Sequence, residues 1–277
     1  MPNKIINTPD LLKGFTFSNP NKGSSGGSSG SSSGSSSGSV RKDLGPTILT
    51  TPSNYELSTK AFGGTRKKEQ ITQIYLHHTA GQRRADKCKK VVNTFNNRAL
   101  AGNYGSTHAC IDADGHLEEL IPWEYRAYGQ GVEGSKISYN TVGMSIEIQA
   151  LGYFKNLSKD GKTWDRGSTT CPADQCAPGV DYNLKDIQYK GYPVYQKYTN
   201  AQIQGTIKWI KKWMAFFNIK WKFDQDAYNN MFPDSGKLSP KATSGAPGVY
   251  SHNSVNKGKS DIYPDKELIK AFKLAFK

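Results

Sequence analysis

Few residues in this chain have types and spacings that suggest chemistry, and the histidines are the most informative of them. There are five histidines in 277 residues, and two of them, His77 and His78, are adjacent. A third, His252, stands nine residues before Asp261. Imidazole and carboxylate groups bind divalent metals and exchange protons near neutral pH. No local HExxH motif is present, so ligands would have to converge from distant segments, and spacing alone leaves surface or core roles open.

A second candidate is Glu147, which lies in the segment TVGMSIEIQA at residues 141–150. Alternation along a strand divides this segment between two faces. One face carries Met144, Ile146 and Ile148, and the other carries Ser145, Glu147 and Gln149. Taken alone, the pattern favours a solvated strand residue at this position.

The elements that must position these residues read as one α/β domain over residues 46–277. Residues 70–76 (QITQIYL) form a predicted strand that leads directly into the histidine pair. Residues 106–111 and 116–121 are predicted strands joined by a turn at 112–115, where Asp-Gly favours a hairpin.

Helices are predicted at three places. The first covers residues 86–98, where apolar residues recur near helical spacing. The second begins at Thr199, which forms a Thr-x-x-Gln capping box with Gln202 ahead of a regular apolar stripe. The third covers 265–276, directly after Pro264. Residues 152–197 read as a long insertion, and a loop of this length is commonly functional or poorly ordered.

The N-terminal region differs in composition from this domain. Residues 23–39 are only glycine and serine, which predicts a flexible tether. Residues 1–22 form a leader too short to fold alone, either an anchor that docks on a partner or a disordered tail. They lack the apolar core and cleavage site of a secretory signal. No stretch approaches the roughly 20 apolar residues of a membrane span.

The four cysteines are too few and too unevenly spaced for a disulfide scaffold. Only Cys171 and Cys176 lie close together, and a zinc knuckle would need a second pair. A local disulfide there requires an oxidising compartment, and reduced thiols are the preferred interpretation.

Several segments, in order, resemble the zinc-dependent N-acetylmuramoyl-L-alanine amidases of the Amidase_2 family, which are related to peptidoglycan recognition proteins. The matching segments are IYLHHTAG (74–81), STHACIDADG (106–115), LIP (120–122) with RAY (126–128), SIEI (145–148), and His252 through Lys259-Ser260-Asp261. The resemblance covers most of residues 70–264. It implies an amidase-like α/β fold, with a single mixed central β-sheet flanked by helices.

The resemblance also implies a Zn²⁺ site formed by His77, His252 and Asp261. Two imidazoles and one carboxylate leave a fourth tetrahedral position open, as in catalytic zinc sites. Neighbours along a regular strand point to opposite faces, so His77 and His78 cannot both be ligands, and the family pattern selects His77.

By the same resemblance, Glu147 is the catalytic glutamate that takes a proton from water and passes it to the leaving amine. Lys259 matches a lysine that stabilises the tetrahedral oxyanion. The implied substrate is the amide between N-acetylmuramic acid and L-alanine of the peptidoglycan stem peptide.

The chain also departs from the family pattern. Gly129-Gln130-Gly131 replaces the usual His-Ala-Gly, which affects stem-peptide recognition, and Thr107 stands where some relatives have a catalytic tyrosine. Three residues remain as substrate-contact candidates, with a structural role equally open for the first. They are His108, Arg126 and Tyr128.

Two other functions compete with this interpretation. A peptidoglycan-binding module without activity would be expected to lack a ligand, whereas all three candidate ligands are present. Nucleic-acid binding is suggested only by the net charge of +14. Positive charge also attracts a protein to the anionic bacterial envelope, and no nucleic-acid motif is present, so we expect no nucleic-acid partner.

The biological setting that fits best is a phage lysin acting on the bacterial cell wall. It would be either an endolysin held in the host cytoplasm until lysis or a virion-associated protein. In the second case residues 1–22 would dock on a tail or baseplate protein.

Overall fold

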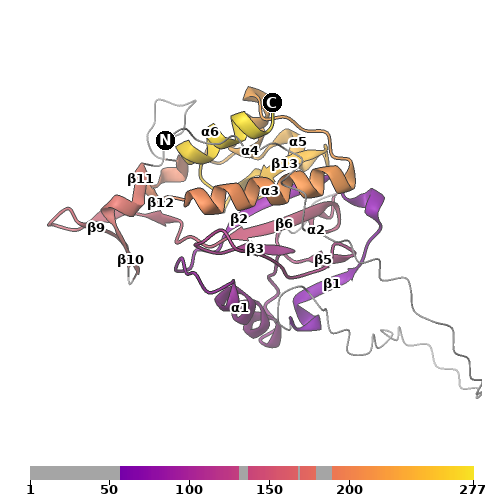
Figure 1. Ribbon diagram of the computed structural model, residues 1–277, viewed down its shortest axis with the longest axis horizontal. Coiled ribbons are helices and arrows are strands. Elements are labelled where there is room, and N and C mark those ends of the chain that lie inside the picture. Colours follow the sequence, from indigo (N-terminus) through magenta and orange to yellow (C-terminus); the bar gives the residue numbers. More distant parts are fainter. Residues whose placement is uncertain (1–56, 131–136, 168, 179–188) are drawn as a thin grey trace, which may run out of the picture. The chain divides into compact units, whose positions relative to one another are not determined.

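A five-stranded sheet forms the centre of the computed structural model, in the order β13-β2-β6-β3-β4 (Figure 1). Strands β13, β2, β6 and β3 run parallel, and β4 is antiparallel to β3, which confirms the predicted mixed sheet. The strands are β2 (Gln73–His78), β3 (Ala109–Ile111), β4 (Leu117–Glu119), β6 (Gly143–Ile148) and β13 (Gly248–Ser251).

The structure describes residues 57–130, 137–167, 169–178 and 189–277. The predicted leader (1–22) and Gly/Ser tether (23–39) lie outside the described residues. These described residues belong to one compact unit. No helix among the described residues is long and apolar enough to cross a bilayer.

The strands at the middle of the sheet are covered on both faces, which explains their near-continuous apolar sequences. All six residues of β2 are buried. On one face, Ile74 packs into the main core together with Met144 and Ile146 of β6. On the other face, Tyr75 packs against Tyr250 of β13 in a smaller cluster.

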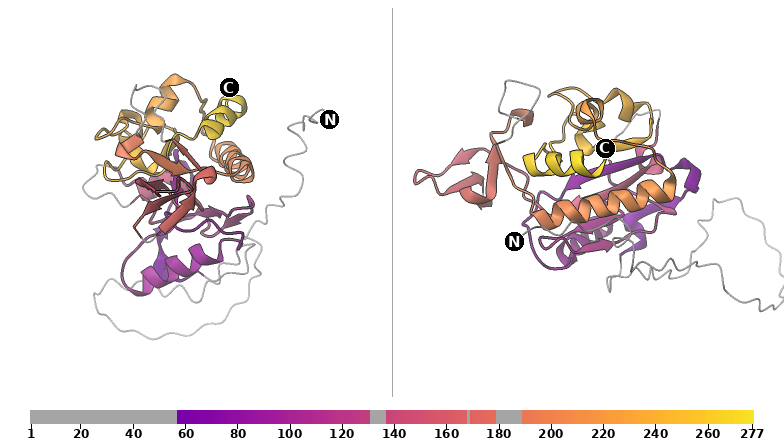
Figure 2. Two further views of the ribbon diagram at one scale, coloured as in Figure 1. Left: turned by 90° about the vertical axis from the view of Figure 1, so that its left-hand side faces the viewer. Right: turned by 45° about the horizontal axis from the view of Figure 1, so that its top comes forward.

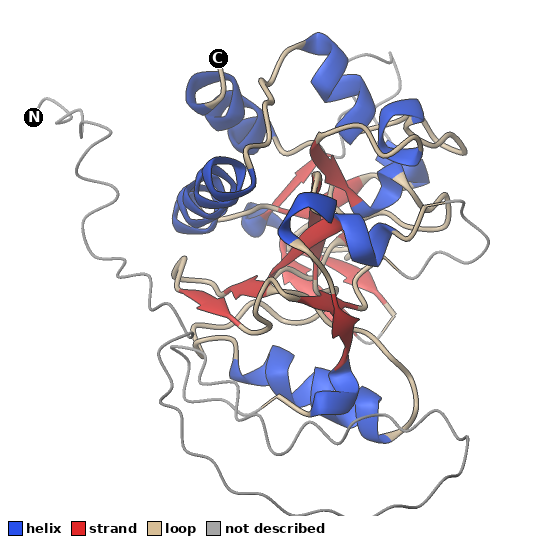
Figure 3. Ribbon diagram, turned by 90° about the vertical axis from the view of Figure 1, so that its right-hand side faces the viewer, coloured by secondary structure: helices blue, strands red, loops and turns tan. Residues whose placement is uncertain are grey.

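Helices cover the sheet from opposite sides, as Figure 3 shows. Helices α3 (Asn200–Phe217) and α6 (Lys266–Ala275) contribute their apolar faces to the main core, whereas α1 (Lys89–Leu100) packs in a separate cluster with Cys110 of β3. The predicted Thr199 capping box is present, and Asp265 caps α6. The three predicted helices are therefore confirmed, with small shifts at their ends.

Several shorter elements were not predicted. Helix α5 packs beside β13 through Ala242, and β1 pairs with β5 in a two-stranded sheet. The bounds are α2 (Tyr139–Val142), α4 (Gln225–Met231), α5 (Pro240–Thr243), β1 (Phe62–Thr65) and β5 (Tyr125–Ala127). The 3-10 helices are η2 (Thr59–Ala61), η3 (Lys68–Gln70), η4 (Ala173–Gln175), η5 (Tyr189–Gly191) and η6 (His252–Ser254).

The insertion at 152–197 is not a plain loop but contains two three-stranded sheets, ordered β10-β9-β8 and β11-β12-β7. Figure 2 shows these sheets extending beyond one end of the central sheet. A small apolar cluster that includes Phe154 and Val194 holds them together. The strands are β7 (Tyr153–Phe154), β8 (Asn156–Leu157), β9 (Thr163–Arg166), β10 (Thr169–Pro172), β11 (Cys176–Pro178) and β12 (Val194–Gln196).

The two ends of the insertion are hydrogen-bonded to each other. The Gln196 backbone N–H donates to the Gly152 carbonyl oxygen at 2.9 Å, and Leu151 N–H donates to Gln196 Oε1 at 2.8 Å. Tyr189 and Tyr195, on the returning segment, belong to the main core. The insertion therefore leaves and re-enters the domain at one place.

The cysteine pairing differs from what the spacing suggested. Cys88 and Cys110 form a disulfide across 22 residues of chain, with their Cα atoms 6.1 Å apart. Cys171 and Cys176 are both buried and free, which agrees with the preferred interpretation of this pair as reduced thiols. The disulfide joins the start of α1 to β3, a contact that only the folded chain creates.

Candidate metal centre

Two histidines and one aspartate from distant parts of the sequence meet at one end of the central sheet. His77 Nδ1 lies 3.0 Å from His252 Nδ1 and 3.1 Å from Asp261 Oδ2. His252 Nδ1 is 3.0 Å from the same carboxylate oxygen. All three residues are buried. Among the described residues, this is the one group of three or more histidine, cysteine or acidic side chains close enough to hold a metal ion.

Strand pairing brings the two histidines together. Strand β13 runs parallel to β2 with Ser251 opposite Leu76, so the next residue on each strand, His252 and His77, lies at the same edge of the sheet. Asp261 is brought to this edge by Asn253. The Asn253 backbone N–H donates to the Asp261 carbonyl oxygen at 3.1 Å, and its side-chain amide donates to the Ile262 carbonyl oxygen at 3.1 Å.

The hydrogen bonds around the cluster suit a cation. His252 Nε2 lies 3.0 Å from the Gln130 carbonyl oxygen, which can only accept, so the proton of a neutral His252 sits on Nε2 and Nδ1 presents a lone pair. Burial raises the pKa of Asp261, but His252 and His77 outweigh this effect and hold the pKa well below its usual value. When both histidines are neutral, His252 Nδ1 and the ionised Asp261 carboxylate carry no proton. His77 Nδ1 then carries at most one, so the three facing atoms are rich in lone pairs.

This donor set fits zinc. Four ligands placed tetrahedrally about 2.05 Å from one ion are about 3.3 Å apart, close to the separations seen here. Two imidazole nitrogens and one carboxylate oxygen are also the mixed ligands typical of catalytic zinc, which keeps one position open.

Glu147 lies next to this cluster on β6, where it is directly opposite His77 in the parallel register. Its Oε2 atom is buried and has no hydrogen-bond partner among the described residues. Burial raises the pKa of Glu147 to about 7, against smaller lowering effects of His77, Arg98 and Lys259. Lys259 itself is exposed, and its charge acts on this carboxylate.

His78 points away from the cluster, as strand alternation predicts. Its Nδ1 lies 3.4 Å from the Tyr198 hydroxyl, and its ring packs against Gly152. Burial lowers the pKa of His78 to about 4, so the ring is neutral at physiological pH. It acts as a buried packing residue where the insertion leaves the sheet.

The three substrate-contact candidates are not brought to the cluster by any contact that the structure describes. His108 is buried, with Nδ1 accepting the Ser145 backbone N–H at 3.0 Å and Nε2 lying 2.6 Å from Arg66 Nη2. Both ring nitrogens are therefore occupied inside the fold. Arg126 donates to the Gly64 carbonyl oxygen at 3.3 Å, and Tyr128 packs beside Tyr104.

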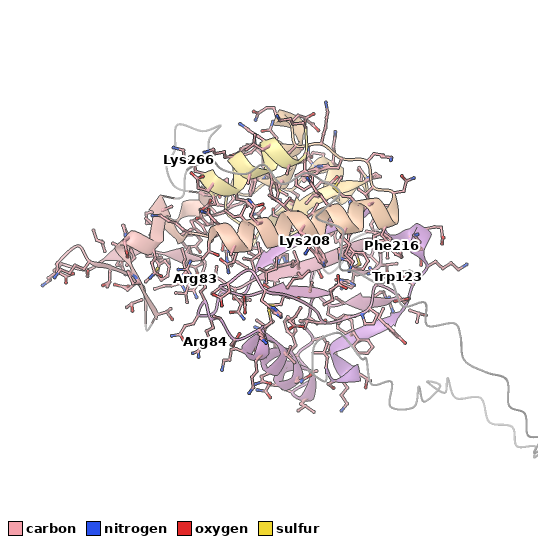
Figure 4. The ribbon with its side chains drawn as sticks, in the orientation of Figure 1. Arg83, Arg84, Trp123, Lys208, Phe216 and Lys266 are labelled. Atoms are coloured by element: carbon pink, nitrogen blue, oxygen red, sulfur yellow. A yellow bond between two sulfur atoms is a disulfide. The ribbon has the colours of Figure 1, made fainter. Side chains whose placement is uncertain are left out.

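A pocket of about 290 Å³ opens beside Glu147, between α1 and the segment that follows β2. Its lining includes the cationic side chains of Arg84, Lys90 and Arg98, none of which was singled out from the sequence. The helical spacing of Lys90 and Arg98 was the available signal, but it does not show which face of a helix lines a pocket. Arg83 and Arg84 lie on the segment between β2 and α1 (Figure 4).

The family model for N-acetylmuramoyl-L-alanine amidases, Amidase_2, matches residues 67–264. The chain therefore belongs to this amidase family, as the sequence resemblance indicated. The matched range includes all three members of the cluster, together with Glu147 and Lys259. No curated protein sequence matches the chain at a significant level.

Solved structures similar to this chain include the N-acetylmuramoyl-L-alanine amidase LysC from Clostridium intestinale, which is 15% identical with a TM-score of 0.41, over 81% of this chain and 96% of that chain. AmiD from E. coli, in complex with anhydro-N-acetylmuramic acid-L-Ala-D-γ-Glu-L-Lys, is 15% identical with a TM-score of 0.39. The match covers 73% of this chain and 57% of AmiD. The endolysin of Thermus scotoductus bacteriophage Ph2119 is 12% identical with a TM-score of 0.34. The match covers 76% of this chain and 87% of the endolysin.

Proposed function

We propose that this protein hydrolyses the amide between N-acetylmuramic acid and L-alanine in peptidoglycan, using a zinc ion held by His77, His252 and Asp261. One observation carries the proposal. Two imidazole nitrogens and a carboxylate oxygen converge within 3.1 Å of one another, beside a buried glutamate oxygen that has no hydrogen-bond partner among the described residues, in a chain of the amidase family.

Zinc bound here would supply Lewis acidity, which lowers the pKa of water and polarises a carbonyl group. The protein's own residues would do the rest. Glu147, in its ionised form, accepts a proton from the attacking water and delivers it to the departing amine nitrogen. The Oε2 atom suits this role because no residue in the described part of the chain hydrogen-bonds to it. The cationic side chain of Lys259 stabilises negative charge that develops on the carbonyl oxygen.

Gln130 would have a positioning role. Its carbonyl oxygen orients the His252 ring and keeps the proton on Nε2, so that Nδ1 faces the cluster. This use of the backbone does not depend on the side chain, so it is compatible with Gln130 lying in a segment that departs from the family pattern.

The test is digestion of purified peptidoglycan, with products identified by mass spectrometry. The wild type should release intact stem peptides, and Glu147→Gln should slow this release by roughly a hundredfold or more. Glu69→Gln, which removes an exposed acid, is the matched control and should retain full activity. Treatment with a chelator should abolish release, and added zinc should restore it.

Cleavage between sugars would contradict the proposed reaction, and release insensitive to chelator would contradict the role of zinc. Binding to peptidoglycan without any release would make the protein a binding module.

We also propose that the protein is a phage lysin. The family membership and the net charge of +14, which attracts a protein to anionic envelopes, support this setting. Antibody detection of the chain in purified virions would indicate a virion-associated lysin docked through residues 1–22. Its presence only in lysates would indicate a free endolysin. Detection in uninfected, phage-free cells would contradict both.

A further inference from the structure

The pocket beside Glu147 has a strongly cationic wall. Arg84, Lys90 and Arg98 all contribute to its lining, and all three are exposed. Glu147 is the one acidic residue in that lining. Among the described residues, none of the three cations forms an ion pair, so their charges are available to a ligand.

Two of these cations are arranged along a single helix face. Lys90, Thr94 and Arg98 follow one another at intervals of four residues on α1, which places their side chains in one row. Eight residues of helix separate Lys90 from Arg98, or about 12 Å at 1.5 Å per residue. An extended peptide spans about the same distance in three to four residues. The row therefore fits a short extended peptide that carries carboxylates.

Glu147 shows which end of this row lies closest to the amide that would be cleaved. The charge of Arg98 acts directly on Glu147, and both residues line the same pocket. A group bound by Arg98 would therefore lie near the scissile amide. Its planar guanidinium pairs with a carboxylate through two parallel hydrogen bonds.

We propose that Arg98 recognises the free α-carboxylate of the γ-linked D-glutamyl residue, the second residue of the stem peptide. This inference rests on the proposed function, because it places the L-alanyl amide beside Glu147. A glutamate joined through its γ-carboxyl retains an ionised α-carboxylate one residue away from that amide. Arg84 and Lys90 add positive potential along the rest of the peptide. The enzyme would then discriminate against stem peptides in which this carboxylate is amidated.

The experiment compares two synthetic ligands that differ in one group. These are N-acetylmuramoyl-L-Ala-D-γ-Glu-L-Lys and the same compound with the glutamyl α-carboxylate converted to a carboxamide. Hydrolysis is followed with the wild type, and the Kd of each ligand is measured by calorimetry on Glu147→Gln, which should leave the ligands intact. We expect roughly tenfold or greater preference for the carboxylate in both measurements.

Arg98→Gln should remove the preference, with little change for the amidated ligand, and Arg98→Lys should retain part of it. Lys89→Gln, one residue from Lys90 but outside the pocket lining, is the matched control and should keep the full preference. Thermal melts verify that the Arg98 variants fold.

Equal hydrolysis of both ligands, or a preference that survives in Arg98→Gln, would overturn the role of Arg98 while the amidase function stands. A carboxylate preference in binding that depends on Arg98, without hydrolysis by the wild type, would support the carboxylate site and overturn the amidase function. Absence of binding and of hydrolysis for both ligands would overturn both.

Discussion

Replacing Glu147 with glutamine should stabilise the metal-free protein at alkaline pH while it removes activity. Burial raises the pKa of Glu147 from its usual value of 4.5 to about 7. The folded chain therefore holds a proton that the unfolded chain has already released between these pH values. Stability contributed by this group is present below pH 4.5 and is lost as the pH rises through 7.

The magnitude follows from the two pKa values. Each unit of separation is worth about 1.4 kcal/mol, so ionised Glu147 destabilises the fold by about 1 kcal/mol at pH 5 and by about 3 kcal/mol at pH 8. The effect of the substitution therefore changes by about 2 kcal/mol between pH 5 and pH 8. For a domain of this size, that is about 4–8 °C in Tm.

Urea unfolding of the wild type and Glu147→Gln at pH 5 and pH 8, with chelator present, measures the effect directly. The advantage of the variant should grow by about 2 kcal/mol between the two pH values. Glu69→Gln is the control, because it makes the same side-chain change at an exposed position away from the site. The same advantage at both pH values for Glu147→Gln would refute the claim that burial holds its proton.

Three further predictions concern the metal, the insertion and the disulfide. His252→Ala should lower bound zinc, measured by emission spectrometry, from one ion per chain to nearly none, and full retention would remove this residue from the ligand set. Gly152→Ala should lower the unfolding free energy by about 2 kcal/mol or more, because its φ is +81° and a Cβ atom would lie 2.6 Å from His78 Nε2. Gly167→Ala, with φ of +68° and open space around it, is the control and should cost clearly less. Equal losses for the two variants would contradict the clash with His78. Cys88→Ser, which opens a loop of 22 residues, should lower the unfolding free energy by about 3 kcal/mol under oxidising conditions, and an unchanged value there would show that the disulfide does not form.

Local patterns in the sequence predicted the elements well because their causes are local. Alternation placed Met144, Ile146 and Ile148 in the core and Glu147 on the opposite face, as the structure shows. The capping box at Thr199 marked the start of α3 because its hydrogen bonds join residues three positions apart. Alternation also separated His77 from His78, although the ligand role of His77 stays a prediction.

Features created by contacts between distant segments could not be predicted in this way. The disulfide between Cys88 and Cys110 depends on how α1 packs against β3. The insertion was expected as a loop, because strands of two to four residues are too short to show a period. The convergence of His252 with His77 was expected only from the family resemblance, since 175 residues separate them and only the parallel pairing of β13 with β2 joins them.

The insertion has two parts with different freedom to change. Its entry and exit are joined by hydrogen bonds of Gln196 with Gly152 and Leu151, so strand register in the central sheet does not depend on how much chain lies between them. The returning part cannot vary freely, because Tyr189 and Tyr195 fill the main core and the Tyr189 hydroxyl contacts the side-chain amide of Asn253, the residue that clamps the Asp261 segment. The hairpin of β9 and β10 differs, because none of its described residues belongs to the main core. A change in the length or surface of this hairpin would therefore leave the packing of the central sheet, and the positions of His77, His252 and Asp261, in place.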